Sequence, residues 1–193
     1  PDLPLLERFN YLGIYSNNLD EFFRVRVASL RRIIDSGTNV LETERKIARE
    51  TLLTILRLNK EYSALFDETF TQLVKELRNA HIHLINEQEL STKQEDEVLG
   101  FFMDKLSGIT NPIFIDSLTF LPEQHLKESL YLAVVLWHEQ GEPVEKHDIA
   151  LLEVPTKELG RFLRLKDEGD ESYLMFLEDV LRYCLPYIFI GRE

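Results

Sequence analysis

The sequence predicts an α+β fold, in which an N-terminal helical bundle is followed by an α+β domain with a small, mainly antiparallel sheet. Residues 38–99 contain neither glycine nor proline, although the chain holds 8 glycines and 7 prolines. Apolar residues there recur at three- and four-residue spacing, as on one face of a helix. From residue 112 onward five of the seven prolines appear and the apolar runs shorten to strand length. We therefore expect a helical domain over residues 1–107 and a second domain, incomplete at its C-terminal end, over residues 108–193, with the junction near residues 107–112.

The composition fits a globular protein with one sizeable domain or two small ones. The chain has 193 residues, of which 44% are apolar, and a formal charge of −12 with a pI near 4.9. Such a charge argues against a general attraction to nucleic acid or to an anionic membrane. Residues 1–40 carry as many arginines as acids, so all of the net negative charge lies beyond them. An anion would meet the least repulsion at the first helices.

The compartment is predicted from Cys184 and from the lack of apolar spans. A single cysteine excludes an intrachain disulfide and fits a reducing, cytoplasmic environment, where we expect Cys184 to be a small buried apolar group. No apolar run approaches the roughly 18 residues that span a bilayer, and no signal peptide pattern is present, so we expect a soluble protein. Peripheral membrane association stays open. Because the chain begins at Pro1 without methionine, we expect a piece of a longer protein.

Two helices are predicted near the N-terminus, over residues 4–16 and 19–34, with Gly37 ending the second. The polar triplet Ser16-Asn17-Asn18 joins them. Asn17 or Asn18 is expected to cap the second helix, which would place two acids in its first turn, where the helix dipole favours them. One cap needs only one asparagine, so the other is free to bind something.

Four arginines of the second predicted helix are candidates for binding phosphate: Arg24, Arg26, Arg31 and Arg32. Guanidinium groups grip phosphate oxygens through paired hydrogen bonds. The alternative is exposed salt bridges with neighbouring acids of the helix, Asp20, Glu21 and Asp35. The pattern alone favours the salt bridges.

A single long helix is predicted from about Glu42 to Ala80. Its apolar face persists over some 38 residues, or roughly 57 Å at 1.5 Å per residue. We expect it to form one long leg of the bundle, with coiled-coil association as the alternative.

Shorter elements are predicted in the rest of the chain. Residues 83–86 are expected as a brief strand, and capping boxes at Ser91 and Thr92 open a helix that runs to about Leu106. Five further strands are predicted over residues 113–115, 130–137, 149–154, 161–165 and 173–177. The Gly141-Glu142-Pro143 break favours a hairpin between the second and third of these. A last helix opens at Glu178 and Asp179, with Pro186 expected to kink or end it.

The residues alone predict no catalytic group and no metal ligand. None of the five histidines belongs to a metal-binding pattern, and we expect surface or capping roles for His81, His83, His125, His138 and His147. We place His81 and His83 on opposite faces of a strand. No glycine-rich phosphate loop and no Gly-x-Ser-x-Gly elbow is present. The acidic pairs Asp20-Glu21 and Glu178-Asp179 are both explained by helix starts.

Several runs of the sequence resemble bacterial polyphosphate kinases of the first type. The N-terminal runs are PLLER at 4–8, LGIYSNNLDEF at 12–22 and VRV at 25–27. Later pieces agree in order, namely LINE at 84–87, TNPI at 110–113, YLAV at 131–134, ALLEVP at 150–155, RF at 161–162 and LRYCL at 181–185. The resemblance therefore covers essentially the whole chain.

The resemblance implies an enzyme of four parts: a helical N-terminal domain, an α+β head domain and two C-terminal catalytic domains. Such enzymes move the terminal phosphate of ATP reversibly onto polyphosphate through a phosphohistidine, with Mg²⁺. The histidines concerned belong to the C-terminal domains and none of the five here matches them, so the fragment alone should be inactive. In the family an asparagine of the Ser-Asn-Asn-Leu-Asp motif contacts ATP, and the matching position is Asn18. The head domain is associated with dimer formation, which implies a subunit-contact role for residues from about 112 onward in a homo-oligomer, a dimer or higher.

Two features of the chain qualify this resemblance. The family's usual opening segment, before Pro1, is missing here, so the first helix is expected to lack a packing partner. The acidic bulk is unsuited to a polyanionic product, so we expect the polyphosphate path to be lined mostly by domains outside this fragment. The alternative function is a non-catalytic helical protein-interaction module, in which Asn18 is only a cap and the long helix is the binding surface.

Overall fold

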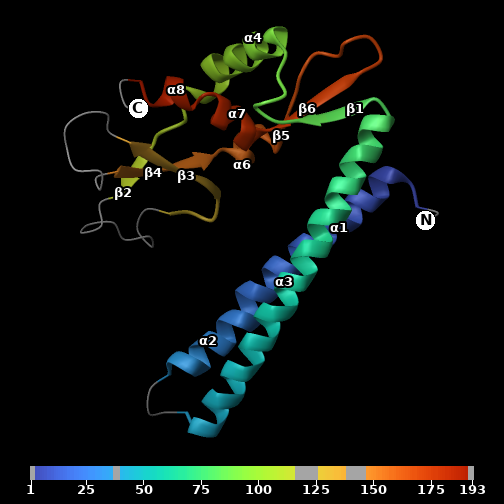
Figure 1. The fold of residues 1–193 in the computed structure, drawn as a ribbon. Helices are drawn as coiled ribbons and strands as arrows, with labels where there is room; N and C mark the ends of the chain where they lie inside the picture. The colour runs from blue at the N-terminus through green and yellow to red at the C-terminus, as the bar shows by residue number, and fades with distance from the viewer. Residues whose placement is uncertain (1–2, 37–39, 116–125, 138–146, 191–193) are drawn as a thin grey trace. The chain divides into compact units, whose positions relative to one another are not determined.

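The computed structural model in Figure 1 describes residues 3–36, 40–115, 126–137 and 147–190. The chain forms two compact units, residues 1–80 and 81–193, and each is described here by itself. The described elements of the first unit are all helices and those of the second are helices and strands, so the predicted α+β class is confirmed. No helix among the described residues is both long enough and apolar enough to cross a membrane.

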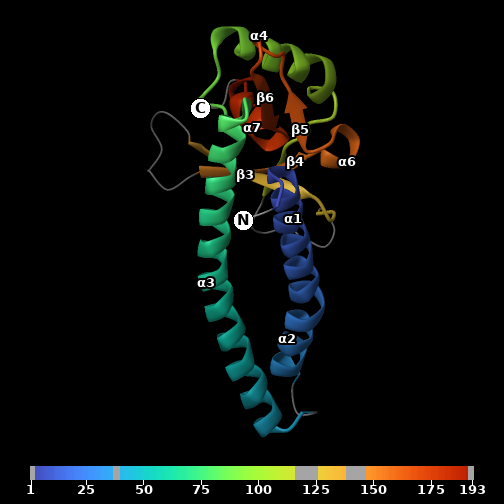
Figure 2. The ribbon, with the colours of Figure 1, turned by 90° about the vertical axis from the view of Figure 1, so that its right-hand side faces the viewer.

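The first unit is a helical hairpin. One leg runs without interruption through α1 (Leu5–Phe22), the π-helical turn η1 (Phe23–Val27) and α2 (Ala28–Asp35). The other leg is the single helix α3 (Glu42–Asn79), which returns alongside α1 and α2 (Figures 1 and 2). The prediction of one long helix over residues 42–80 is thus confirmed almost to the residue.

The predicted break at Ser16-Asn17-Asn18 is wrong. Both asparagines lie inside α1, are exposed and cap nothing, and the acids that follow them are not in a first turn. The reason is that the row of apolar side chains on the inner side of α1 continues past the triplet, from Leu12 to Leu19. An asparagine in a helix interior costs only about 0.7 kcal/mol relative to alanine, which is less than the packing of one such leucine contributes. The second leg ends at Asp35, and Gly37 lies outside the described residues.

Aromatic pairs and a short buried stripe hold the two legs together. Phe9 of α1 meets Phe70 of α3 edge to face, with ring centroids 6.1 Å apart, and Tyr15 stacks on Phe66 at 5.9 Å. Among the described residues of this unit, the buried apolar ones are Val27, Ala48, Leu73 and Leu77. Because these contacts all lie on one side of α1, its opposite side is left to solvent.

The described part of the second unit holds two three-stranded sheets, where the sequence predicted one small sheet. The mixed sheet has the order β1 (Ile82–Ile85), β6 (Ser172–Phe176), β5 (Phe162–Arg164). Its β1–β6 pair is parallel, with Ile82 opposite Ser172. The antiparallel sheet has the order β2 (Ile113–Ile115), β4 (His147–Val154), β3 (Leu130–Trp137). All five strands predicted after residue 112 are therefore present.

The predicted hairpin pairing of β3 and β4 is confirmed, since Leu130 lies opposite Val154 and Trp137 opposite His147. The Gly141-Glu142-Pro143 break itself lies outside the described residues. The antiparallel pairing is the arrangement that a short connection between sequential strands allows.

Helices cover these sheets, as Figure 1 shows: α4 (Thr92–Phe101) with the π turn η2 (Phe102–Leu106), α6 (Thr156–Leu159), α7 (Leu177–Tyr183) and α8 (Leu185–Ile188). The start of α4 follows the predicted capping box, because the Ser91 backbone N–H donates to the Gln94 side chain at 3.0 Å. Pro186 lies in the first turn of α8, directly after α7 ends, so the predicted effect of this proline is also confirmed.

The core of the second unit shows why the chain divides after Ala80 and not near residue 107. Val98, Phe102 and Leu106, from α4 and η2, are buried together with Leu152 of β4 and Leu181 of α7. The apolar face of residues 92–106 is thus covered by strands and helices that follow it. The predicted junction lies inside this unit because periodicity identifies an apolar face but not its partner.

Candidate functional site

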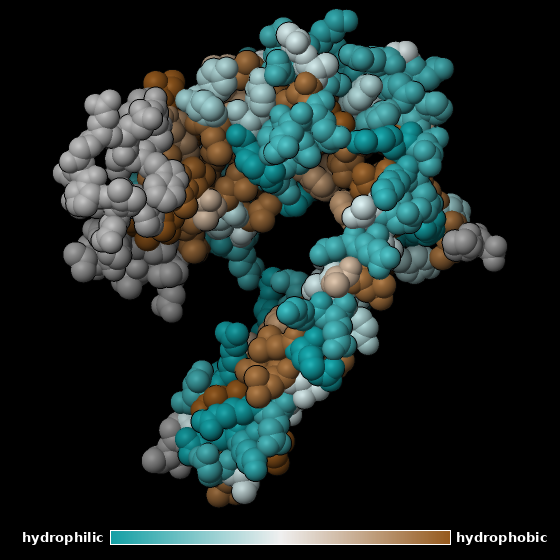
Figure 3. Space-filling view, in the orientation of Figure 1, coloured by the Kyte–Doolittle hydropathy of each residue, from teal (hydrophilic) through white to brown (hydrophobic). Residues whose placement is uncertain are grey.

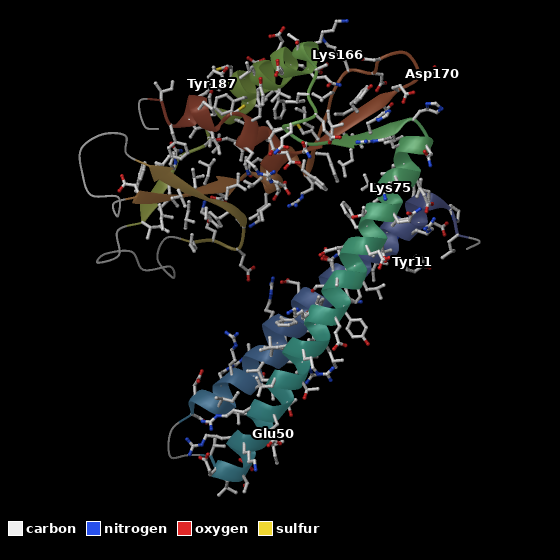
Figure 4. All side chains as sticks on the ribbon, in the orientation of Figure 1. Tyr11, Glu50, Lys75, Lys166, Asp170 and Tyr187 are labelled. Carbon is white, nitrogen blue, oxygen red and sulfur yellow. The ribbon has the colours of Figure 1, made fainter. Side chains whose placement is uncertain are left out.

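Asn18 lies on the solvent side of α1, in a row of exposed side chains spaced four residues apart. Ile14, Asn18, Phe22 and Arg26 are neighbours at i, i+4, i+8 and i+12, and all four are exposed. We call this row the Asn18 ridge. Ile14 is 45% and Phe22 39% exposed, so two large apolar side chains flank the amide. Figure 3 shows apolar side chains at the surface of the helical unit as brown patches.

The π turn η1 keeps the end of this row in line. The Ala28 N–H donates to the Phe23 carbonyl five residues back, which widens one turn of the helix. In an α-helix of 3.6 residues per turn, a row at four-residue spacing drifts around the axis. The wider turn reduces that drift between Phe22 and Arg26 and directs Val27, the next residue, into the interface with α3, where it is buried.

The four candidate arginines differ in their surroundings. Arg24 forms an exposed salt bridge with Asp20 at 2.8 Å, so the salt-bridge interpretation is confirmed for this residue. Arg31 and Arg32 precede Asp35 by four and three residues, which is the spacing of helical ion pairs, although the described residues show no ion pair to either arginine. Arg26 has Phe22, Phe23, Ser29 and Leu30 at these spacings. It is the only one of the four without an acid at such a position.

The inner side of α1 is fixed by a polar contact as well as by apolar packing. The Arg8 guanidinium donates two hydrogen bonds to the Glu76 carboxylate, at 2.5 and 3.1 Å, and both side chains are partly buried. These hydrogen bonds lower the pKa of Glu76 below its usual value. Together with the ring contacts of Phe9 and Tyr15, they hold the rotation of α1 about its axis and hence the direction of the Asn18 ridge.

Two hollows between α1 and α3 adjoin the stacked pair of Tyr15 and Phe66. Their volumes are about 180 and 150 Å³, and their walls are mainly apolar. Pockets that enclose a ligand of drug size measure roughly 300–1,000 Å³. Each hollow is therefore too small to enclose a nucleotide, and Asn18 does not line either of them. A nucleotide at Asn18 therefore needs further walls from outside the helical unit.

The second unit brings together two histidines that the sequence placed on opposite faces of a strand. His81 Nδ1 and His83 Nε2 contact the two carboxylate oxygens of Glu171, at 2.7 and 2.5 Å, and the pKa of Glu171 is lowered by both hydrogen bonds. The prediction is wrong because residues two apart in a strand point to the same face. His81 directly precedes β1 with a φ of 61°, and both rings still reach Glu171. His83 also stacks on Tyr173 at 4.8 Å.

The remaining histidines add no cluster that the structure describes. His147 begins β4, while His125 and His138 lie outside the described residues. Within the described ranges, no group of three or more His, Cys, Asp or Glu side chains is arranged to hold a metal ion.

Cys184 and the last acidic pair have the structural roles that the sequence predicted. Cys184 is fully buried, and burial raises the pKa of its thiol to about 12, so a thiolate is disfavoured. Glu178 and Asp179 lie in the first turn of α7. They also pair with arginines, Glu178 with Arg161 at 2.5 Å and Asp179 with Arg182 at 2.8 Å.

The order of the two units matches two described domain families. Residues 1–85 match the polyphosphate kinase N-terminal domain, and residues 93–193 match the polyphosphate kinase middle domain. A solved structure with the same fold is the polyphosphate kinase from Porphyromonas gingivalis. Its TM-score is 0.72 at 28% identity, and the alignment covers 99% of this chain and 28% of that one. These similarities define the class of the chain, which has the fold and the domain order of polyphosphate kinase N-terminal and middle domains.

Curated relatives name the family. The polyphosphate kinase of Escherichia coli (strain K12) is 35% identical over 97% of this chain and 27% of its own length. That of Vibrio parahaemolyticus serotype O3:K6 is 31% identical over 98% of this chain and 26% of its own. The chain belongs to the polyphosphate kinase family, and it spans about a quarter of the length of these relatives. The resemblance seen in the sequence is confirmed.

Proposed function

We propose that this chain is the N-terminal part of an ATP–polyphosphate phosphotransferase, and that Asn18 contacts ATP. The full enzyme would transfer the terminal phosphate of ATP reversibly to polyphosphate through a phosphohistidine on a domain outside this chain. The observation that carries the proposal is the match of both units, in order, to the N-terminal and middle domains of the family. The exposed amide of Asn18, which caps nothing, supports the ATP contact.

The chemistry of the site suits nucleotide positioning rather than bond making. Phosphoryl transfer depends mainly on orientation and on neutralising charge. A side-chain amide donates and accepts hydrogen bonds, so Asn18 can hold a ribose or a phosphate without taking part in the reaction.

The proposal assigns Mg²⁺ and polyphosphate mainly to other domains. Mg²⁺ prefers carboxylate and phosphate oxygens in octahedral geometry. The Asn18 ridge itself carries no acid, so it would not repel the phosphates of ATP.

The second unit is proposed to contribute subunit contacts in a cytoplasmic homo-oligomer. Phe114 of the short edge strand β2 and Val135 of β3 are 43% and 45% exposed. The register places them on opposite faces of the sheet, so each face presents one apolar side chain that such a contact could cover.

The test uses the full-length enzyme, made with Asn18→Ala and with Asn17→Ala as the matched control. Loss of a hydrogen bond to a charged ligand should raise the KM for ATP roughly tenfold in Asn18→Ala, while Asn17→Ala leaves it unchanged. The separate fragment of 193 residues should neither hydrolyse ATP nor form polyphosphate. If Asn18→Ala and Asn17→Ala have the same KM for ATP, the proposed ATP contact of Asn18 is wrong. If the purified fragment turns over ATP, the assignment of the catalytic histidines to other domains is wrong.

The alternative, a non-catalytic helical interaction module, is favoured by exposed apolar side chains on α3. Leu53 is 67% and Leu65 57% exposed. The reading frame after Glu193 separates the two proposals, because only the kinase requires a downstream domain with a phosphorylatable histidine.

A further inference from the structure

We infer that Arg26 is a phosphate-binding residue of the same site, which contacts the phosphoanhydride chain of the ligand that Asn18 holds. The inference rests on the proposed ATP contact of Asn18. It goes beyond that contact because it assigns one of four ambiguous arginines to the ligand and leaves the other three as surface residues.

The first argument is position. Arg26 continues the i+4 row from Asn18 through Phe22, so all three side chains emerge on one side of the helix. Arg24 emerges on a different flank, where it meets Asp20. Eight residues separate Asn18 and Arg26, or about 12 Å along the axis at 1.5 Å per residue. The ribose and phosphates of one ATP can bridge such a separation, with Phe22 between its two ends.

The second argument is charge. A guanidinium with a carboxylate neighbour is already neutralised in part, and an incoming phosphate must compete with that acid. No acid lies three or four residues from Arg26 on either side. Among the described residues no ion pair to Arg26, Arg31 or Arg32 is present, whereas Arg24, Arg45, Arg49 and Arg57 each have one. Arg31 and Arg32 differ from Arg26 in having Asp35 within helical ion-pair spacing. Arg26 therefore keeps its full charge for an anion.

The third argument is the backbone at this place. The π turn from Phe23 to Val27 contains Arg26. Such turns replace the regular i→i+4 hydrogen bonds of the α-helix with i→i+5 bonds, and they occur frequently at functional sites. Here the turn places Val27 in the buried interface while Arg26 stays exposed in the row of Asn18. The π turn is thus compatible both with the burial of Val27 and with the alignment of Arg26 in the Asn18 ridge.

The ligand chemistry is a phosphoanhydride, and two sources share it: the triphosphate of ATP and the polyphosphate chain. The experiment separates them in the full-length enzyme with Arg26→Gln and Arg26→Lys. The matched control is Arg24→Gln, an exposed arginine of the same turn that is paired with Asp20. Steady-state kinetics are measured with ATP varied at saturating polyphosphate and, in the reverse direction, with polyphosphate varied at saturating ADP.

The expected result is a KM that rises roughly 10- to 100-fold for Arg26→Gln and less for Arg26→Lys, because charge remains but the paired hydrogen bonds are lost. Arg24→Gln should stay within about twofold of the parent enzyme, since exposed ion pairs contribute little. A rise for ATP alone assigns Arg26 to the triphosphate, and a rise for polyphosphate alone assigns it to the product chain. Thermal unfolding should be equal in all variants, because Arg26 is exposed.

Failure of this inference is distinct from failure of the proposed function. If Asn18→Ala raises the KM for ATP while Arg26→Gln leaves both KM values unchanged, the phosphate contact is wrong and the ATP contact stands. If neither substitution has an effect in an active enzyme, the whole ridge is excluded from the ligand site. Equal effects of Arg24→Gln and Arg26→Gln would reduce the role of Arg26 to general surface charge.

Discussion

Arg8 and Glu76 join the two legs of the helical unit through a bidentate contact between residues 68 positions apart in the chain. The pair lies on the inner side of α1, and the Asn18 ridge lies on the outer side of the same helix. Because a helix rotates as one body, a contact that fixes its inner side also fixes where its outer side points. The Arg8–Glu76 salt bridge therefore helps to set the direction in which Asn18 and the rest of the ridge point.

Replacing Arg8 with glutamine should lower the stability of the helical unit. The partly buried carboxylate of Glu76 would lose its charged partner, and the melting temperature should fall by a few degrees. Arg57→Gln, which removes an exposed pair with Glu61, is the matched control and should change little. Circular dichroism during heating measures both. An equal and small shift in the two variants would show that the Arg8 contact contributes nothing special.

The same pair predicts a pH dependence. The pKa of Glu76 is lowered in the folded chain, so its stabilising contribution is present above the unfolded value of about 4.3 and is lost as the pH falls through the lower folded value. The difference in melting temperature between the parent chain and Arg8→Gln should therefore be full near pH 7. It should shrink in the acid range below pH 4. A difference that stays constant down to pH 3 would contradict the assignment.

Asn17 and Asn18 allow a test in which the structure and a capping role predict opposite signs. Inside an exposed helix, alanine is more favourable than asparagine by up to about 0.7 kcal/mol, so each alanine variant should be slightly more stable than the parent. An N-cap would instead lose about 1 kcal/mol on the same substitution. Urea unfolding of the two variants decides the sign. If only one of the two variants is destabilised, that asparagine is an N-cap and the helix is broken at this place.

The elements of the fold could largely be predicted from local patterns, because each has a period or a cap that the sequence displays. The helix over residues 42–79 and the five strands after residue 112 are examples. What local patterns do not contain is the partner of each element. The strand β1 pairs with β6 across some 90 residues, and the apolar face of α4 is covered by segments that follow it, so the second sheet and the division after Ala80 were not predictable.

The candidate site was predictable only in part. Asn18 came from the resemblance to a family, while the local pattern predicted a cap at the same place. The signal for Arg26 is present in the sequence, as a spacing of eight from Asn18 and as the lack of an acid at three or four residues. It had no meaning while a helix break was expected between the two, because only a continuous helix puts them in one row.

Cys184 should be unreactive in the folded chain. Its thiol is fully buried and has a pKa raised to about 12, so neither access nor a thiolate is available at pH 8. Iodoacetamide should label it only after the chain is unfolded in guanidinium. A Ser107→Cys variant supplies an exposed thiol in the same preparation and should be labelled at once. Rapid labelling of Cys184 in the native chain would show that the core around α7 opens easily.

The division of the chain after Ala80 predicts which fragments fold. A fragment of residues 81–193 retains β1, α4 and the full second core, whereas residues 108–193 lose Ile85, Val98, Phe102 and Leu106. Four buried side chains contribute about 1.5–3 kcal/mol each, which together approaches the whole stability of about 5–15 kcal/mol of a typical domain. The longer fragment should unfold cooperatively on heating, and its amide proton spectrum should be well dispersed. The shorter one should show neither property. Cooperative unfolding of residues 108–193 would mean that α4 is an accessory to this core, and that the boundary near residue 107 is the correct one.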